Sequence, residues 1–131
     1  MDWEKFYDSM KAKGGSSVKS IHSLSLQIMR MMTILDGFPS LSMTEIFAIG
    51  GAFGSNFQIQ GQEYNCVEYH NGIYVYQSGE RTIAYGETSR FIMIVCGEAN
   101  AKGPCLEAAD FGLSILNALP YYTEAYYNGH S

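Results

Sequence analysis

The chain has 131 residues, of which 47% are hydrophobic and 16% charged, and this balance is typical of one folded domain rather than a disordered chain. Eight basic residues against thirteen acidic ones give a net charge of −5. The basic residues form no run, so we expect no nucleic-acid partner. The longest strongly apolar run, residues 91–96, is too short to cross a bilayer.

The first residues, MDWEKFYDSM, lack the basic end and apolar stretch of a signal peptide. We therefore expect no membrane insertion and a cytoplasmic protein. The three cysteines are irregularly spaced, which fits free thiols in a reducing compartment.

An N-terminal helix is predicted from the spacing of apolar residues. Trp3, Phe6, Tyr7 and Met10 fall at i, i+3, i+4 and i+7, which places them on one face of a helix. Gly14 follows as a stop signal.

Residues 17–35 fit either a helix or a strand. Serines alternating with apolar residues at positions 23–28 favour a strand. We predict a strand over residues 24–35 that turns at Asp36-Gly37 into a short second strand.

Residues 43–57 are predicted to form a helix, because Ser42 and Glu45 have the spacing of a capping box. Three glycines at positions 50, 51 and 54 are costly in a helix, at about 1 kcal/mol each relative to alanine. One alternative is a hairpin. The other is close backbone approach on the face that Gly50 and Gly54 share, either to the sheet of the same chain or to the same helix of a second subunit.

Four strands are predicted over residues 64–70, 73–78, 81–87 and 90–97. Asn71-Gly72 is a strong hairpin signal between the first two. The last strand is apolar on both faces and is expected at the centre of a sheet. Tyrosines are frequent along this meander, at positions 64, 69, 74, 76 and 85.

The segment Cys96 to Cys105, CGEANAKGPC, is predicted to connect the last strand to a helix that begins near Pro104 and ends before Pro120. The cysteines have no second ligand pair nearby, so we expect two buried small side chains, and neither a metal site nor a disulfide. Residues 120–131 form a tyrosine-rich tail. No nucleophile elbow and no marked acid–base pair is present, so we expect no catalytic residues and no cofactor.

The order of these elements resembles the roadblock (dynein light chain-like) family. The segments that carry the resemblance are FIMIVCGE with the following ANAKG and a helix, and ILDGFPSLSMTEIFAIGGAFG with its DG hairpin and central helix. The resemblance covers most of residues 2–119, which we expect to form one domain. The family has three strands after the central helix, whereas four are counted here.

The resemblance implies an α+β fold with roadblock/profilin-like layering. Its sheet would be mostly antiparallel, of five to six strands, with N-terminal, central and C-terminal helices. Such proteins pair through sheet edges with their central helices alongside, and act as non-enzymatic platforms or regulators for Ras-like small GTPases. Gly50 and Gly54 would then lie at or near the dimer face, and the strand at 64–70 or 73–78 would be the joining edge.

The leading hypothesis is a homodimeric scaffold or regulator of a Ras-like small GTPase or a similar protein, such as another roadblock-like protein. Aromatic residues are enriched at binding hot spots, and the candidate contact residues are Gly50, Phe53, Gly54, Tyr69, Tyr74 and Tyr76. The second hypothesis is a small-molecule sensor whose methionines and aromatics line a cavity. A third is an enzyme that uses Cys66 or His70.

Overall fold

The computed structural model describes residues 2–120, which form three helices and one curled, seven-stranded antiparallel sheet. The elements in chain order are α1 (Trp3–Gly14), β1 (Val18–Ser25), β2 (Arg30–Leu35), α2 (Met43–Ala52), β3 (Phe57–Ile59), β4 (Gln62–His70), β5 (Ile73–Gln77), β6 (Arg81–Glu87), β7 (Phe91–Glu98) and α3 (Lys102–Ala118). The strand order across the sheet is β2-β1-β7-β6-β5-β4-β3.

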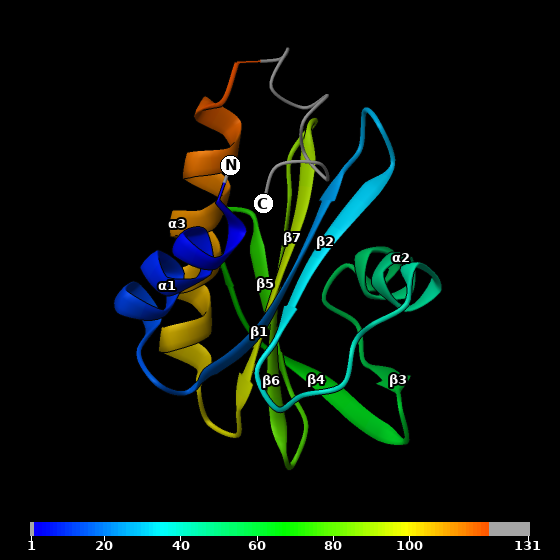
Figure 1. The fold of residues 1–131 in the computed structure, drawn as a ribbon. Helices are drawn as coiled ribbons and strands as arrows, with labels where there is room; N and C mark the ends of the chain where they lie inside the picture. Colours follow the sequence, from blue (N-terminus) through cyan, green and yellow to red (C-terminus); the bar gives the residue numbers. More distant parts are fainter. Residues whose placement is uncertain (1, 121–131) are drawn as a thin grey trace.

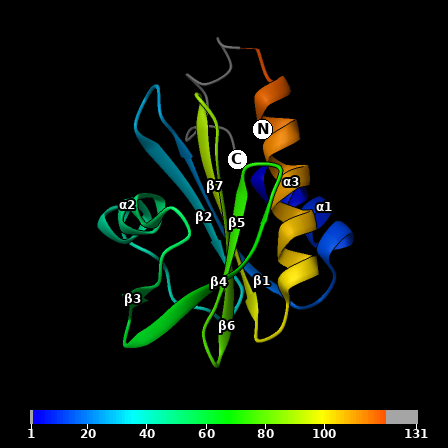
Figure 2. The same cartoon turned by 180° about the vertical axis from the view of Figure 1, so that it is seen from behind.

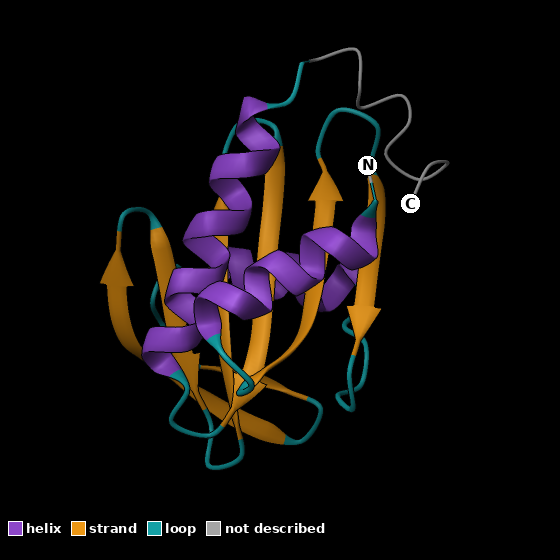
Figure 3. Ribbon diagram, turned by 60° about the vertical axis from the view of Figure 1, so that its left-hand side comes forward, coloured by secondary structure: helices purple, strands orange, loops and turns teal. Residues whose placement is uncertain are grey.

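The helices cover opposite faces of the sheet. α1 and α3 lie together on one face, and α2 lies alone on the other (Figure 1 and, from behind, Figure 2). Figure 3 shows α1 and α3 crossing each other in front of the strands. The predicted α+β class and the three helix positions are therefore confirmed, whereas the prediction of five to six strands is wrong.

The strands at the centre of the sheet are buried on both sides. The first core cluster joins α1 and α3 to the sheet through residues such as Trp3, Met10 and Leu116. The second joins α2 to the opposite face through residues such as Ile46, Ile49 and Ile94. Seven of the eight residues of β7 are buried, as predicted for a central strand.

The first hairpin differs from its prediction. β1 ends at Ser25 and β2 begins at Arg30, so the turn lies at residues 26–29 and not at Asp36-Gly37. Gly37 does adopt a positive φ of 93°, but the chain continues from it to α2 as a loop without a further strand. The predicted short second strand is therefore wrong.

The central helix is confirmed, but it is shorter than predicted. Ser42 and Glu45 form the expected capping box, and α2 ends at Ala52 rather than at residue 57. The hairpin alternative for residues 43–57 is wrong. Phe57 instead begins β3, a strand of three residues that pairs with β4.

The open edges of the sheet are not all where the sequence placed them. β5 pairs with β4 on one side and β6 on the other, so residues 73–78 cannot be a joining edge. The outermost strands are β2 and β3. β3 covers only residues 62–64 of β4.

The segment from Cys96 to Cys105 joins β7 to α3, as predicted. Thr82 ties this connection to the sheet, because its Oγ1 donates to the carbonyl of Glu98 at 2.8 Å and accepts from the amide of Ala101 at 3.2 Å. No helix among residues 2–120 is both long and apolar enough to cross a membrane. Of the predicted tail, residues 120–131, all except Pro120 lie outside the described residues.

Candidate functional site

Gly50 and Gly54 lie against the sheet of their own chain. A Cβ atom at Gly50 would collide with the hydroxyl group of Tyr85. At Gly54, where φ is 88°, a Cβ atom would come within 3.2 Å of the Tyr74 ring. Of the two sequence-based explanations for these glycines, approach to the sheet of the same chain accounts for both positions.

Three aromatic side chains lie near the C-terminus of α2. Tyr69 and Tyr74 are cross-strand neighbours on β4 and β5, and their ring centroids lie 4.4 Å apart. Phe53 caps α2 in a left-handed conformation and is 76% exposed, and Tyr69 is 58% exposed. We call Phe53, Tyr69 and Tyr74 the aromatic surface.

The aromatic surface borders an open hollow of about 440 Å³. Its wall is built from the C-terminal half of α2, the β4–β5 turn, β5, and the end of β6 with its following turn: Gly50, Phe53, Gly72, Tyr74, Tyr85, Glu87, Thr88 and Ser89. Because Gly50 has no side chain, the Tyr85 hydroxyl can lie directly against the helix. The same hydroxyl donates a 2.6 Å hydrogen bond to the carboxylate of Glu87. Burial, and secondly this carboxylate, raise the pKa of Tyr85.

The hollow combines aromatic walls with a polar rim. Tyr74, Tyr85 and Phe53 offer ring surface, while Glu87, Thr88 and Ser89 offer a carboxylate and two hydroxyl groups. Such a site suits an apolar or aromatic side chain that carries a hydrogen-bond donor or a positive charge at its end. No nucleophile with an adjacent base lies among the lining residues.

Tyr76 is not part of this surface, contrary to the sequence-based expectation. It is fully buried, at 0% exposure, and its hydroxyl accepts a 2.9 Å hydrogen bond from the amide of Gly54. Burial raises the pKa of Tyr76. Its role is to fix the chain just after α2, and so to position Phe53.

The sequence-predicted site residues therefore separate into two groups. Gly50, Phe53 and Tyr74 line the hollow, and Tyr69 extends it. Gly54 and Tyr76 support it from beneath. Tyr85 and Glu87 were missed as members of the site. Their spacing of two residues on one strand, which puts both on one face, is the signal that could have found them.

His22 is a third residue whose role the sequence did not reveal. It is 1% exposed, and its Nε2 accepts a 2.9 Å hydrogen bond from the amide of Leu41, in the loop before α2. Among the described residues its Nδ1 has no hydrogen-bond partner. Burial lowers the pKa of His22 to about 4, against an opposing effect of Glu45, so the imidazole is neutral near pH 7.

Cys96 and Cys105 are buried small side chains, as predicted, and Cys66 is half-buried. Cys96 and Cys105 are 5% and 0% exposed, all three thiols are free, and burial raises the pKa of Cys96 to about 11. Cys66, considered as a nucleophile, is half-buried, and its thiol donates to the Glu68 carbonyl at 3.5 Å. Within residues 2–120, no group of three metal-binding side chains is found.

Comparison with known proteins adds no assignment. No protein-family model matches the chain, and no curated protein matches it.

Proposed function

We propose that this protein is a non-enzymatic binding domain, a homodimeric scaffold or regulator that holds a Ras-like small GTPase or a similar protein. The observation that carries the proposal is the aromatic surface beside α2, where Phe53 and Tyr69 are exposed, the rings of Tyr69 and Tyr74 are in contact, and an open hollow lies next to them. Large exposed aromatic side chains beside a pocket are typical of binding hot spots. The GTPase class of partner comes from the roadblock resemblance.

The backbone around the aromatic surface supports its use as a rigid platform. Tyr69 and Tyr74 stand on paired strands, and Phe53 follows a helix whose end is tied to Tyr76. A surface held in this way loses little conformational entropy when a partner binds.

The first experiment is affinity capture of the tagged protein from lysate of its source cells, followed by mass spectrometry. The expected result is a stoichiometric Ras-like GTPase or a related roadblock-like protein. The captured protein is then purified and titrated against wild type and two variants, Phe53→Ala and Tyr69→Ala.

Each variant should weaken binding about tenfold or more, because truncation of a hot-spot residue costs about 2 kcal/mol or more. Met29→Ala is the matched control, since Met29 is also an exposed apolar side chain, at 46%, but lies in the β1–β2 turn. A captured GTPase whose affinity is the same for all four proteins would contradict the proposed surface.

A second function is favoured by the hollow itself. Its volume of about 440 Å³ falls within the range of small-molecule sites, and a sensor domain would carry its ligand there. This alternative predicts an adduct in the native mass spectrum of the purified protein, or a thermal shift in a metabolite panel. If neither is seen, the ligand hypothesis is wrong.

A further inference from the structure

β2 leaves one long side of the sheet open. It is the terminal strand of the sheet, and on its inner side it pairs with β1 over six residues, from Ser20↔Leu35 to Ser25↔Arg30. Figure 1 shows β2 beside β1, at the front of the sheet. An open edge strand carries a row of backbone groups that are free to pair with another strand.

The hydrogen-bonding phase of the hairpin shows which backbone groups face outward. The amide of Asp36 donates to the carbonyl of Lys19 at 2.8 Å, so residues 30, 32, 34 and 36 direct their backbone groups toward β1. Met31, Thr33 and Leu35 therefore direct theirs away from the sheet. No backbone hydrogen bond within the described chain uses these outward groups.

The hydrogen-bonding phase between β1 and β7 agrees with the assignment of outward-facing groups on β2. The amide of Leu26 donates to the carbonyl of Arg90 at 2.8 Å, which directs the even-numbered residues of β1 toward β7 and the odd-numbered ones toward β2.

The exposed edge is apolar and poorly protected. β2, RMMTIL, contains one charged residue and no proline. Ile28, Met29 and Leu35, in β2 and its preceding turn, are exposed by 38%, 46% and 46%. Edge strands of monomers usually carry several charges, a proline or a bulge that prevents pairing.

We propose that β2 pairs antiparallel with β2 of a second copy of this chain, about a two-fold axis at Thr33. The pairing rests on the proposed function, in that it specifies how the homodimer of that function forms. Thr33 is then opposite Thr33 of the second copy, and Met31 is opposite Leu35 in both directions. All three outward-facing residues form hydrogen-bonded pairs in this register, and the sheet continues through both copies.

Charge complementarity selects this register over its neighbours. With Thr33 on the axis, Arg30 of each copy lies opposite Asp36 of the other, on the face that carries α1. Arg30 has no ion pair among the described residues, and its exposed side chain lies at the start of β2. A shift of two residues keeps the hydrogen-bonding phase but separates these opposite charges. Opposite charges in a cross-strand pair contribute roughly 0.2–1 kcal/mol.

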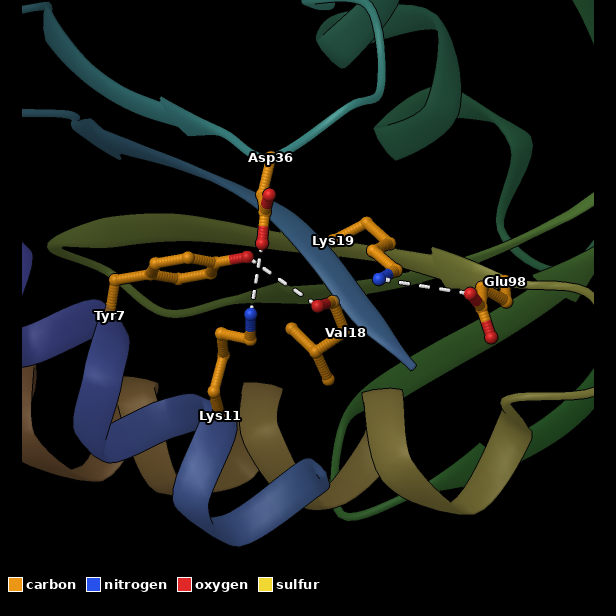
Figure 4. Close-up of polar contacts among 6 residues, drawn as sticks. All are labelled: Tyr7, Lys11, Val18, Lys19, Asp36 and Glu98. Carbon is orange, nitrogen blue, oxygen red and sulfur yellow. Dashed lines mark hydrogen bonds and ion pairs between the residues drawn. The ribbon is translucent and has the colours of Figure 1, made fainter. Parts of the chain in front are cut away.

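Asp36 is placed to accept a second cation. Figure 4 shows its carboxylate at the end of β2, pointing toward Lys11 of α1, with which it forms a 2.9 Å ion pair. Its side chain is nevertheless 52% exposed. This Lys11 contact lowers the pKa of Asp36, so the carboxylate is ionised near pH 7.

The test is a charge-swap experiment by sedimentation velocity across a concentration series. Wild type is expected to reach twice the monomer mass as its concentration rises. Arg30→Glu alone places two carboxylates opposite each other at both ends of the pair, and Asp36→Arg alone places two cations there. Each variant should dimerise about tenfold or more less tightly than wild type.

An equimolar mixture of the two variants should dimerise again, because every facing pair is then of opposite sign. Lys5→Glu is the matched control for Arg30→Glu, since it makes the same change in net charge at an exposed position of α1. This control should dimerise like wild type.

Thr33→Pro tests the proposed pairing of β2 with the second copy without removing a hydrogen bond between β1 and β2. Its amide points outward, so proline there removes a donor from the edge and none from the hairpin. We expect a monomer with the circular dichroism spectrum of wild type.

Three results would overturn the inference: a wild type that stays monomeric at all concentrations, an Arg30→Glu variant that dimerises as tightly as wild type, or a mixture that dimerises no better than either variant alone. A monomeric protein that still binds a GTPase through Phe53 and Tyr69 would remove this inference and the homodimer, and would leave the GTPase-binding part of the proposed function standing.

Discussion

The imidazole of His22 is buried between β1 and the loop that leads into α2, where its Nε2 accepts a hydrogen bond from Leu41. A protonated imidazole could not accept that bond, and its charge would be buried. Because the pKa of His22 falls from 6.5 to about 4 on folding, the unfolded chain binds the proton more readily. The stability that the neutral ring contributes is present above pH 6.5 and is lost as the pH falls toward 4.

We therefore predict that the free energy of unfolding falls by about 3 kcal/mol between pH 7 and pH 4 because of His22 alone. His22→Gln keeps a hydrogen-bond acceptor but does not titrate, so its stability should fall less over the same range. Urea unfolding at several pH values measures the difference, with the exposed His70→Gln as control. Parallel pH profiles for wild type and His22→Gln would contradict the assignment.

Gly50 and Gly51 are adjacent glycines of α2 with opposite expected responses to alanine. A Cβ at Gly50 meets the buried Tyr85 hydroxyl, whereas a Cβ at Gly51 meets nothing within 4 Å. Gly51→Ala should raise the free energy of unfolding by about 0.5–1 kcal/mol, because alanine is the better helix former. Gly50→Ala should lower it by about 1 kcal/mol or more, since overpacking outweighs that gain. Chemical denaturation of the two variants measures both signs, and a stabilised Gly50→Ala would show that Tyr85 does not pack on α2 as described.

At the scale of secondary-structure elements, α3 depends on a cation at its C-terminus. Arg90, 5% exposed, donates from Nη1 to the carbonyls of Asn117 at 3.1 Å and Leu119 at 2.6 Å. Cations at this end of a helix are favoured, because the last carbonyl groups lack partners within the helix.

Arg90→Met should destabilise the protein by roughly 2 kcal/mol, the range for a buried hydrogen bond to a charged group. Hydrogen exchange should quicken first in the last turn of α3. Lys5→Met, at an exposed position of α1, should change neither quantity by much. Unchanged protection at residues 115–118 in Arg90→Met would refute this role.

How well each element could be predicted depended on whether its turn or cap has a distinctive residue. Asn71-Gly72 was recognised, and both residues adopt positive φ, of 52° and 79°. Gln60-Gly61 makes the equivalent turn between β3 and β4, with φ of 53° and 77°, but glutamine is not a characteristic turn residue, so β3 was missed. The β1–β2 turn contains Met29 at a φ of 51° and no glycine, which is why the strand was predicted to run on to Asp36.

The site was partly predictable for the same reason. The three glycines of α2 signalled close approach, but only the sheet register shows that β5 and β6 bring Tyr74 and Tyr85 beneath the helix. Strand alternation alone assigns Tyr74 and Tyr76 to one face and cannot show that α2 covers Tyr76 while leaving Tyr74 at the rim of the hollow. Whether Tyr74 and Tyr76 are exposed is therefore decided by contacts with residues far away in the sequence.

In the whole molecule, the two proposed interaction surfaces lie on different parts of the sheet. The aromatic surface belongs to α2, β4 and β5, near the β3 end of the strand order, and the proposed dimer edge is β2, at the opposite end. A dimer formed through β2 would therefore leave both aromatic surfaces available, and one dimer could hold two partners.

Whether the aromatic surface binds a GTPase is decided by isothermal calorimetry, in which the captured GTPase is titrated against wild type, Phe53→Ala, Tyr69→Ala and Met29→Ala. We predict binding for wild type and Met29→Ala, with affinities about tenfold or more lower for the two aromatic-surface variants. Equal affinities across the four proteins, or no GTPase that binds at all, would contradict it.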